Sequence, residues 1–269
     1  MTNLIAIMVV YNTEITESRA YKCVLNEKNI KVIVCDNSTI SNNNKMLVEK
    51  DGNIYISMQG NKGLSKAYNR AIDYIMNNNF NEVDYEVDYI ILMDDDTYFP
   101  CEYFKEVREK INQSKLDIYL PTVLDESGKA GYLSPSIMKN GYCHRADDIK
   151  AIKQDELCGI NSGMVMKKEI FENYRYNEDI FLDYVDHNFI RDMKRLDKKM
   201  EVLETDLKQS FSSSSDTKEK SKNRFKIFKK DIDIFYRYGF SDRLMFHYVI
   251  FRRKVNLLQK FKDFTVIFW

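Results

Sequence analysis

Three short apolar runs constrain the fold of this chain more than any other feature. Residues 4–10 read LIAIMVV, residues 30–35 read IKVIVC and residues 89–93 read YIILM. Continuous apolar runs of this length are typical of parallel strands that are buried on both faces. Between them, 53–58 is a shorter strand candidate, and 64–76 carries apolar residues at helical spacing. Strands that alternate with helices predict an α/β fold with an open, mostly parallel, Rossmann-like central sheet flanked by helices.

The remainder of the chain has a weaker pattern. Gly, Pro and Ser interrupt 121–157, which predicts loops and short strands laid over the sheet. A loop followed by a strand is expected over 158–166, and helices are expected over 169–174 and 181–199. From 224 to 269, Phe, Tyr, Ile and Leu recur at helical spacing with Lys and Arg between them. The chain is therefore expected to end in a helical C-terminal extension.

Charge is divided unequally along the chain. The sequence has 41 Lys and Arg and 41 Asp and Glu, so no net field indicates nucleic acid as a partner. Residues 218–269 hold 14 basic and 5 acidic residues, a net charge of +9. That leaves 41 − 14 = 27 basic and 41 − 5 = 36 acidic residues, a net charge of −9, for 1–217. We therefore predict a main domain over 1–217 and a basic, aromatic extension over 218–269.

The cysteine and histidine residues show no spaced motif. The five cysteines are Cys23, Cys35, Cys101, Cys143 and Cys158, and the three histidines are His144, His187 and His247. An odd number of cysteines without a C-x-x-C pair favours reduced thiols over a disulfide framework or a zinc site. We expect no signal peptide, and no apolar stretch approaches the roughly 20 residues that cross a bilayer. We expect a cytoplasmic protein.

Polar residues follow the predicted strands at their carboxyl ends. Tyr11 and Asn12 follow the first strand, Asp36 begins the DNS segment after the second, and 94–96 (DDD) follows YIILM. In open α/β sheets, ligands bind in the crevice at the carboxyl ends of the strands. The sequence therefore predicts a polar pocket at this edge of the sheet.

The acidic triplet at 94–96 is the most informative motif. Three adjacent carboxylates at the end of a buried strand repel one another, and a cation would relieve that repulsion. Mg²⁺ and Mn²⁺ are held by one or two carboxylates, with substrate phosphates completing the coordination shell. The alternative is a solvated acidic turn that caps a following helix. A P-loop and a G-x-G-x-x-G fingerprint are both absent from the sequence, so a nucleotide would be bound in another way.

Six segments within 4–191 carry a resemblance to a known family. They are AIMVVYN, VCDNS, NKGLSKAYNRAI, ILMDDDT, GINSGMVM and FLDYVDHNFIR. In this order and spacing, the chain resembles the bacterial family 2 glycosyltransferases, which include rhamnosyltransferases of polysaccharide biosynthesis. The resemblance implies a GT-A fold, with 1–217 as the catalytic domain. It also implies a UDP- or dTDP-sugar donor, Mn²⁺ or Mg²⁺ as cofactor, and transfer with inversion to a saccharide or lipid-linked saccharide acceptor.

The resemblance also assigns donor-binding residues. Tyr11 and Asn12 would lie at the base pocket, and Asp36 would accept a hydrogen bond from the pyrimidine ring; the alternative for Asp36 is a turn or helix-cap role. Three further residues would flank the donor and start the helix below it: Asn61, Gly63 and Asn69. At Gly63, the missing Cβ would let the backbone approach the donor closely.

The metal and the catalytic base are assigned in the same way. Asp96 would be the principal metal ligand, and Asp94 would face both the ribose and the metal. Asp95 would belong to the nucleotide-sugar site as its variable middle residue. The base that deprotonates the acceptor hydroxyl would be Asp186, with Asp183 in reserve. The alternative for this pair is a charged helix N-terminus, on which residues three apart share a face.

One departure concerns the metal. Many relatives supply a histidine ligand some 20–30 residues beyond the base, but the corresponding region here reads LETDLKQSFSSSS. Gln209, Ser210 or water would then complete the coordination shell.

Several alternatives remain open from the sequence. The extension over 224–269 would lie on the inner face of the cell membrane, or it would pack as a lid or a homodimer interface. A non-catalytic carbohydrate- or nucleotide-binding protein of the same fold is the main functional alternative. A phosphatase of the haloacid dehalogenase type is a further one, because DDDT resembles the D-x-D-x-T motif of those enzymes.

Overall fold

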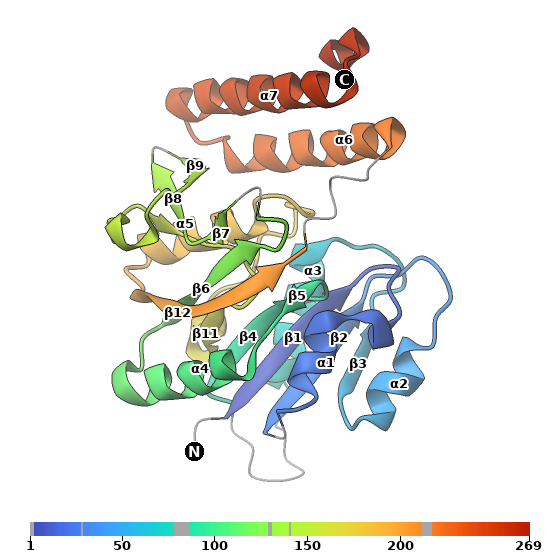
Figure 1. The fold of residues 1–269 in the computed structure, drawn as a ribbon, viewed down its shortest axis with the longest axis vertical. Helices are drawn as coiled ribbons and strands as arrows, with labels where there is room; N and C mark the ends of the chain where they lie inside the picture. Colours follow the sequence, from blue (N-terminus) through green and yellow to red (C-terminus); the bar gives the residue numbers. More distant parts are fainter. Residues whose placement is uncertain (1–2, 28, 78–86, 129–130, 140, 211–216) are drawn as a thin grey trace.

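The structure is a computed structural model that describes residues 3–27, 29–77, 87–128, 131–139, 141–210 and 217–269. Its central sheet has the strand order β3-β2-β1-β4-β11-β6-β12-β5, and β7 pairs with β6 at the side (Figure 1). Helices lie on both faces of this sheet, as in the α/β class expected from the sequence.

The first half of the sheet is parallel. β3 (Ile54–Ser57), β2 (Ile30–Asp36), β1 (Leu4–Val10) and β4 (Tyr89–Asp94) pair in this order and run in one direction. The side chains of β1 and β4 are almost fully buried, which explains their continuous apolar runs. All four predicted strands are therefore confirmed.

The second half of the sheet was only partly predicted. β11 (Val165–Lys167) runs antiparallel between β4 and β6 (Ile118–Asp125), whereas β12 (Met200–Gln209) runs parallel to β6 and antiparallel to β5 (Thr97–Tyr98). The expectation of loops and short strands from residue 121 onward is wrong for β6. Pro121 interrupts its pattern, and prolines are rarely found in an inner strand. β12 was missed because most of its side chains are polar and few are buried, so it shows no apolar run in the sequence.

Short strands do cover the sheet elsewhere, as expected. β7 (Tyr132–Ser134) pairs with β6, and a separate three-stranded sheet has the order β10-β8-β9. Its strands are β8 (Ser136–Lys139), β9 (Tyr142–Arg145) and β10 (Leu157–Cys158). Short 3₁₀ helices occur at η1 (Ile15–Glu17), η2 (Ile149–Ala151), η3 (Lys168–Glu172) and η5 (Phe264–Phe268).

The helices divide the core into two layers. α1 (Arg19–Val24), α2 (Asn44–Lys50) and α4 (Cys101–Ser114) pack on one face of the sheet. α3 (Leu64–Asn77) and α5 (Val185–Arg195) pack on the other face. Alternate residues of each central strand enter the two layers, as the pleat of a strand requires.

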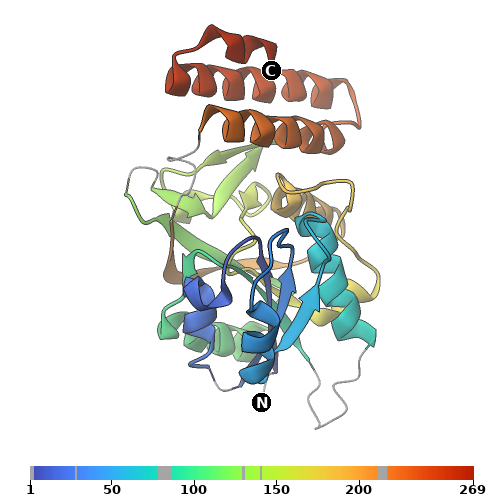
Figure 2. The same ribbon diagram turned by 90° about the vertical axis from the view of Figure 1, so that its right-hand side faces the viewer.

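The C-terminal residues form α6 (Lys218–Phe235) and α7 (Phe240–Phe261), which confirms the predicted helical extension. Figures 1 and 2 show these two helices stacked at one end of the molecule, beyond β8 and β9, with α7 outermost. The side chains of Phe225, Ile232 and Phe235 are buried and join the same core cluster as α3 and α5. α6 thus shares a core with α3 and α5, and α7 packs over α6.

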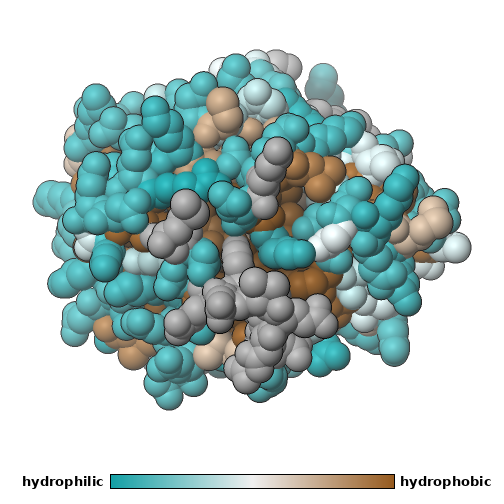
Figure 3. Space-filling model, turned by 90° about the horizontal axis from the view of Figure 1, so that it is seen from below, coloured by the Kyte–Doolittle hydropathy of each residue, from teal (hydrophilic) through white to brown (hydrophobic). Residues whose placement is uncertain are grey.

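The opposite end of the molecule, where β1 begins, is mostly hydrophilic with apolar side chains exposed between (Figure 3). Among the described residues, no helix is both long enough and apolar enough to cross a membrane.

Candidate functional site

The acidic triplet lies at the turn between β4 and β5. β4 ends at Asp94, and β5 begins at Thr97, directly after Asp96. The backbone carbonyl of Asp95 accepts hydrogen bonds from the Arg19 backbone N–H (2.9 Å) and from the Ser18 hydroxyl (3.0 Å). The start of α1 therefore holds this turn in place, because its unpaired N–H groups need acceptors.

Gln209 joins the two outer carboxylates of the triplet. Its Nε2 donates to Asp94 Oδ2 at 3.2 Å and to Asp96 Oδ1 at 3.0 Å. The sheet explains this contact, since β12 pairs with β5 so that Gln209 lies opposite Thr97. Of the substitutes that the sequence offered for the missing histidine, Gln209 is thus the one that contacts the triplet. One oxygen of Asp94 and one of Asp96 therefore lie within hydrogen-bond distance of the same nitrogen, Gln209 Nε2.

Burial and mutual repulsion perturb the three carboxyl groups. Burial, followed by the charges of Asp96 and Asp95, raises the pKa of Asp94 to about 7. Burial also raises the pKa of Asp95 and of Asp96, although the Gln209 amide opposes the shift at Asp96. A converging set of carboxylates that resist ionisation together suits a divalent cation with oxygen ligands. The residues present therefore fit the metal that the resemblance implies.

Asp36 is buried at the end of β2, and its carboxylate is already well bonded. Oδ1 accepts from the Ser38 backbone N–H at 2.8 Å. Oδ2 accepts from Asn42, Asn44 and the Tyr55 hydroxyl at 3.0, 3.0 and 3.2 Å. Burial acts to raise the pKa of Asp36, but these hydrogen bonds outweigh it and lower the pKa. Asp36 thus organises the turn after β2, which was its alternative role, and its contact with a pyrimidine stays a prediction.

Tyr11 and Asn12 lie beside that turn. Half of the Tyr11 side chain is exposed, and Asn12 has a left-handed backbone (φ 54°). Asn12 N donates to Ser38 Oγ at 2.8 Å, and Asn12 Oδ1 accepts from Thr39 N at 2.8 Å. The ends of β1 and β2 are therefore tied together by hydrogen bonds.

Gly63 and Asn69 contact protein segments rather than open space. A Cβ on Gly63 (φ +91°) would lie 2.7 Å from a ring carbon of Phe181 and 2.8 Å from its carbonyl oxygen. Asn69 is buried, and its side chain exchanges hydrogen bonds with the Tyr176 backbone (2.9 and 2.8 Å). Asn61 accepts from Gly63 N at 3.2 Å within the same loop. These residues join the start of α3 to 176–181, so the close approach expected at Gly63 is to Phe181.

The candidate base segment is held by α6. Three consecutive backbone N–H groups, from Phe181, Leu182 and Asp183, donate to the buried Asp231 carboxylate at 2.8–2.9 Å. α5 begins only at Val185, so the predicted helix from residue 181 is wrong at its start, and its predicted end at 199 is also wrong because α5 stops at Arg195. Residues 181–183 instead form a loop that turns its N–H groups toward Asp231.

Asp183 and Asp186 consequently have different surroundings. Asp183 precedes α5 and pairs with Arg224 at 2.7 Å, whereas Asp186 lies in the first turn of α5, so the two do not share a helix face. Burial raises the pKa of Asp183 to about 6, and Arg224 opposes that shift. Asp186 Oδ1 accepts from the backbone N–H of His187 at 2.7 Å and lies 3.2 Å from its ring Nδ1.

Tyr68 is a candidate site residue that sequence reasoning missed. It lies on α3, is fully buried, and its hydroxyl has no hydrogen-bond partner among the described residues. Burial raises its pKa well above the ordinary value, and the charges of Asp94 and Asp186 contribute to that rise. Tyr68 therefore lies near both carboxylates. In the sequence it was one apolar member of a helical stripe, and nothing distinguished its hydroxyl.

Comparison with known proteins agrees with this geometry. Residues 5–175 match the model of Glycosyl transferase family 2. The dTDP-rhamnosyl transferase RfbF of Shigella flexneri is 28% identical over 189 residues, which cover 69% of this chain and 61% of that protein. The match thus spans less than two thirds of the length of this relative.

Solved structures share the fold. TarS of S. aureus, residues 1–349, has a TM-score of 0.55 at 15% identity, covering 86% of this chain and 64% of that one. The complex of the same protein with UDP has a TM-score of 0.56 at 15% identity, covering 87% of this chain and 66% of that one. This likeness confirms the GT-A type of fold. Because the family match spans more than half of the sequence, the resemblance noted from its motifs is also confirmed, and the chain belongs to glycosyl transferase family 2.

Proposed function

We propose that this chain is an inverting glycosyltransferase acting in cell-surface polysaccharide synthesis. It moves a sugar from a UDP- or dTDP-sugar to a saccharide or lipid-linked saccharide acceptor. The family match supports the reaction class, and the dTDP-rhamnosyl transferase and the UDP complex support the two donor nucleotides. The observation that carries the proposal is the convergence of Asp94 and Asp96 at the carboxyl end of β4.

The proposed cofactor is Mn²⁺ or Mg²⁺, held by Asp96 and Asp94. The oxygens of both carboxylates lie within hydrogen-bond distance of one nitrogen, Gln209 Nε2, so they are arranged around one small volume. When bound, the metal would neutralise charge on the departing nucleotide diphosphate. Asp95, whose backbone carbonyl is bound by α1, serves mainly to fix the turn.

The donor nucleotide is proposed to lie above the ends of β1, β2 and β4. Tyr11 offers an exposed aromatic ring there, and Asn12 and Asp36 shape the adjoining turn. Asn61, Gly63 and Asn69 hold the start of α3 against 176–181, beside the proposed donor site.

Asp186 is proposed as the general base. It would accept the proton of the acceptor hydroxyl while that hydroxyl attacks opposite the diphosphate, which inverts the anomeric centre. The charges of Asp186 and Asp94 both raise the pKa of Tyr68, which supports a position of Asp186 near the triplet. Asp183 is the weaker candidate because Arg224 already pairs with it.

A transfer assay tests the proposal. The chain is incubated with UDP- and dTDP-sugars, Mn²⁺ and lipid-linked saccharide acceptors, and release of UDP or dTDP is measured. Metal-dependent release with one nucleotide class is expected. Nucleotide binding without transfer to any acceptor would favour the non-catalytic binding protein. The phosphatase alternative loses support, because the triplet ends β4 instead of the first strand and the family match is to a glycosyl transferase.

We also propose that the extension over 218–269 rests on an anionic membrane surface, at the inner face of the cell membrane if the chain is cytoplasmic. Its outer helix exposes an apolar stripe at helical spacing, consisting of Phe240 (82% exposed), Leu244, Tyr248, Phe251 (65%) and Val255. The extension carries a net charge of +9 from 14 basic and 5 acidic residues. An apolar face within a basic segment favours a bilayer interface, where each basic residue near anionic lipid adds roughly 1 kcal/mol.

Co-sedimentation of the full chain with vesicles tests this surface. Binding to vesicles containing phosphatidylserine, and its loss in Phe240→Ser/Phe251→Ser, are expected. Loss of dimerisation in that variant, without vesicle binding by the parent chain, would instead identify a homodimer interface.

A further inference from the structure

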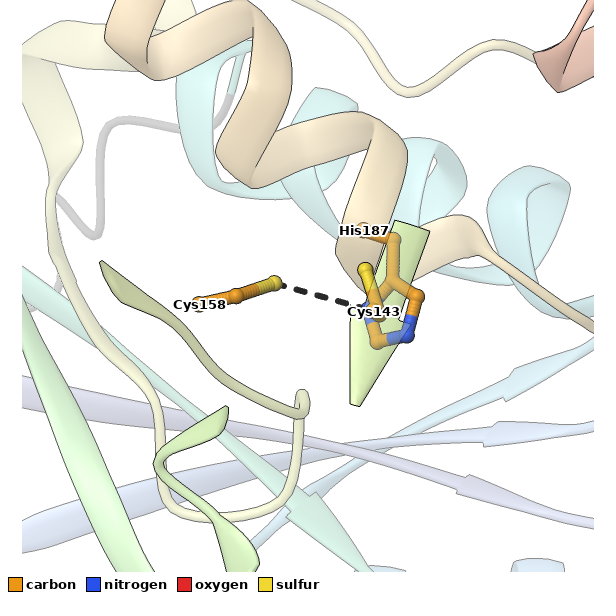
Figure 4. Close-up of side chains that lie close together, drawn as sticks. All are labelled: Cys143, Cys158 and His187. Atoms are coloured by element: carbon orange, nitrogen blue, oxygen red, sulfur yellow. Dashed lines mark hydrogen bonds between the residues drawn. The ribbon is translucent and has the colours of Figure 1, made fainter. Parts of the chain in front are cut away.

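Three soft metal-binding side chains that are distant in sequence meet beside α5. Cys143 comes from β9, Cys158 from β10 and His187 from the first turns of α5. Their ligand atoms, two thiol sulfurs and one imidazole nitrogen, all lie within 4.8 Å of one another. Figure 4 shows Cys158 pointing toward the His187 ring, with Cys143 beside that ring. No other such group is found among the described residues.

The geometry matches the edge of a tetrahedral zinc site. With Zn–S bonds of about 2.3 Å and Zn–N bonds of about 2.0 Å, sulfur and nitrogen ligands stand about 3.5 Å apart. Cys158 Sγ lies 3.6 Å from His187 Nδ1. A thiol hydrogen bond would explain this distance equally well. The zinc site is therefore argued from the third side chain, because Cys143 brings a second thiol to the same place from a different strand.

Burial favours a bound ion. Cys158 is fully buried and Cys143 and His187 are half-buried, so solvent has limited access to the centre of the group. Proteins bind zinc through two thiolates and one imidazole, and water can occupy the fourth position.

We propose that Cys143, Cys158 and His187 bind one Zn²⁺ ion. The ion joins the three-stranded sheet to the start of α5, two parts that β11 and η3 separate along the chain. It is separate from the Mn²⁺ or Mg²⁺ of the acidic triplet, which has only oxygen ligands.

The site has a consequence for Asp186, and this consequence rests on the proposed function. His187 follows Asp186 directly, and its Nδ1 lies 3.2 Å from Asp186 Oδ1. A metal bond to Nδ1 would replace any hydrogen bond from this nitrogen to Asp186, and it would fix the ring and the first turn of α5. The zinc site would then hold Asp186 in position, and His187 would act as a positioning residue.

Metal analysis of the purified full chain tests the site. We expect equimolar zinc after purification in zinc-containing buffer, and its loss in Cys158→Ser and in His187→Ala. Cys101→Ser and His144→Ala are matched controls that should keep zinc, because Cys101 is exposed and neither residue belongs to the group. Asp96→Ala should also keep zinc, which separates the site from the acidic triplet.

A second measurement uses the wild-type protein, so its result does not depend on whether the variants fold. Wild-type protein is stripped with a chelator and titrated with Co²⁺, and thiolate-to-cobalt charge-transfer absorption is expected at one equivalent. Absence of zinc and of this absorption would overturn the proposal. A Cys143–Cys158 disulfide found by mass spectrometry under non-reducing conditions would overturn it as well. Neither result would affect nucleotide binding at the triplet, so the proposed function is tested independently.

Discussion

Gln209 donates a hydrogen bond to the carboxylate of Asp96 at 3.0 Å across 113 residues of sequence. The contact exists because β12 returns alongside β5 and ends with Gln209 opposite Thr97. The side chain that follows the candidate base by 23 residues thus reaches the triplet, where relatives of this family were expected to supply a histidine. An amide donates its N–H here, but its oxygen is only a weak metal ligand beside an imidazole.

Gln209→His should therefore strengthen metal binding. An imidazole at this position would add a nitrogen ligand next to Asp94 and Asp96, and we expect about a 10-fold lower Kd for Mn²⁺, an order of magnitude that metal-site changes commonly produce. Gln209→Ala is the matched control and should not strengthen binding. Calorimetric titration with Mn²⁺ measures both. Equal affinities of the His and Ala variants would place this side chain outside the coordination shell.

Asp186→Asn should remove the base and leave the donor site intact. Loss of a general base typically lowers kcat by about 10²- to 10⁴-fold. The Kd for the nucleotide should stay unchanged, because Asp186 lies on α5 and the nucleotide is expected above β1 and β2. Asp179→Asn, an exposed carboxyl group in the preceding loop, is the control. If Asp183→Asn lowers kcat and Asp186→Asn does not, the roles of the two residues are reversed.

Gly63→Ala should destabilise the protein by steric conflict with Phe181. The added Cβ would lie 2.7 Å from the Phe181 ring and 2.8 Å from its carbonyl oxygen. Gly52→Ala is a matched control, since Gly52 also has positive φ but has nothing within 4 Å of the added Cβ. Both variants lose about 1 kcal/mol from backbone strain, and Gly63→Ala should lose about 1–3 kcal/mol more from overpacking. Denaturant unfolding compares them, and equal losses would show that Phe181 moves away freely.

Asp36→Asn should destabilise the protein in a pH-dependent way. The folded pKa of Asp36 lies below its ordinary value of 3.8, because Ser38, Asn44 and Asn42 outweigh the effect of burial. Its ionised form therefore stabilises the fold above pH 3.8, and that contribution is lost as pH falls through the folded pKa. Hydrogen bonds to a charged group each contribute about 1.5–3 kcal/mol, so a loss of this order is expected at pH 7. Thermal unfolding should show the gap between the proteins narrowing below about pH 4; a gap independent of pH would contradict the role of the charge.

The parallel half of the sheet could be predicted because each of its strands is recognisable from its own short stretch of sequence. β1, β2 and β4 are buried on both faces, so each strand appears in the sequence as an uninterrupted apolar run. The positions of Asp36 and Asp94 follow from where those runs end. The spacing of the six family motifs then supplied the donor and metal assignments.

The contacts that complete the site could not be predicted, because they depend on distant pairing. β12 is largely polar, so neither its place beside β5 nor the contact of Gln209 with Asp96 is visible in the sequence. Asp231 binds three N–H groups of the base segment, yet in sequence it is one acidic residue in a basic tail.

The same limit applies to the cysteines. Their spacing favoured unrelated reduced thiols, whereas the short strands β9 and β10 bring Cys143 and Cys158 together beside His187. Only the three-dimensional arrangement made a zinc site worth testing.

Asp94 and Asp96 are proposed to hold a divalent metal that binds a nucleotide diphosphate. The most direct measurement is the thermal shift produced by UDP, dTDP and GDP, each with and without Mn²⁺, on the wild-type chain and on Asp96→Ala. We expect a shift with UDP or dTDP that requires Mn²⁺ and disappears in Asp96→Ala. A shift of equal size without Mn²⁺, or in the Asp96→Ala variant, would contradict the role of the metal, and no shift with any nucleotide would contradict the donor site itself.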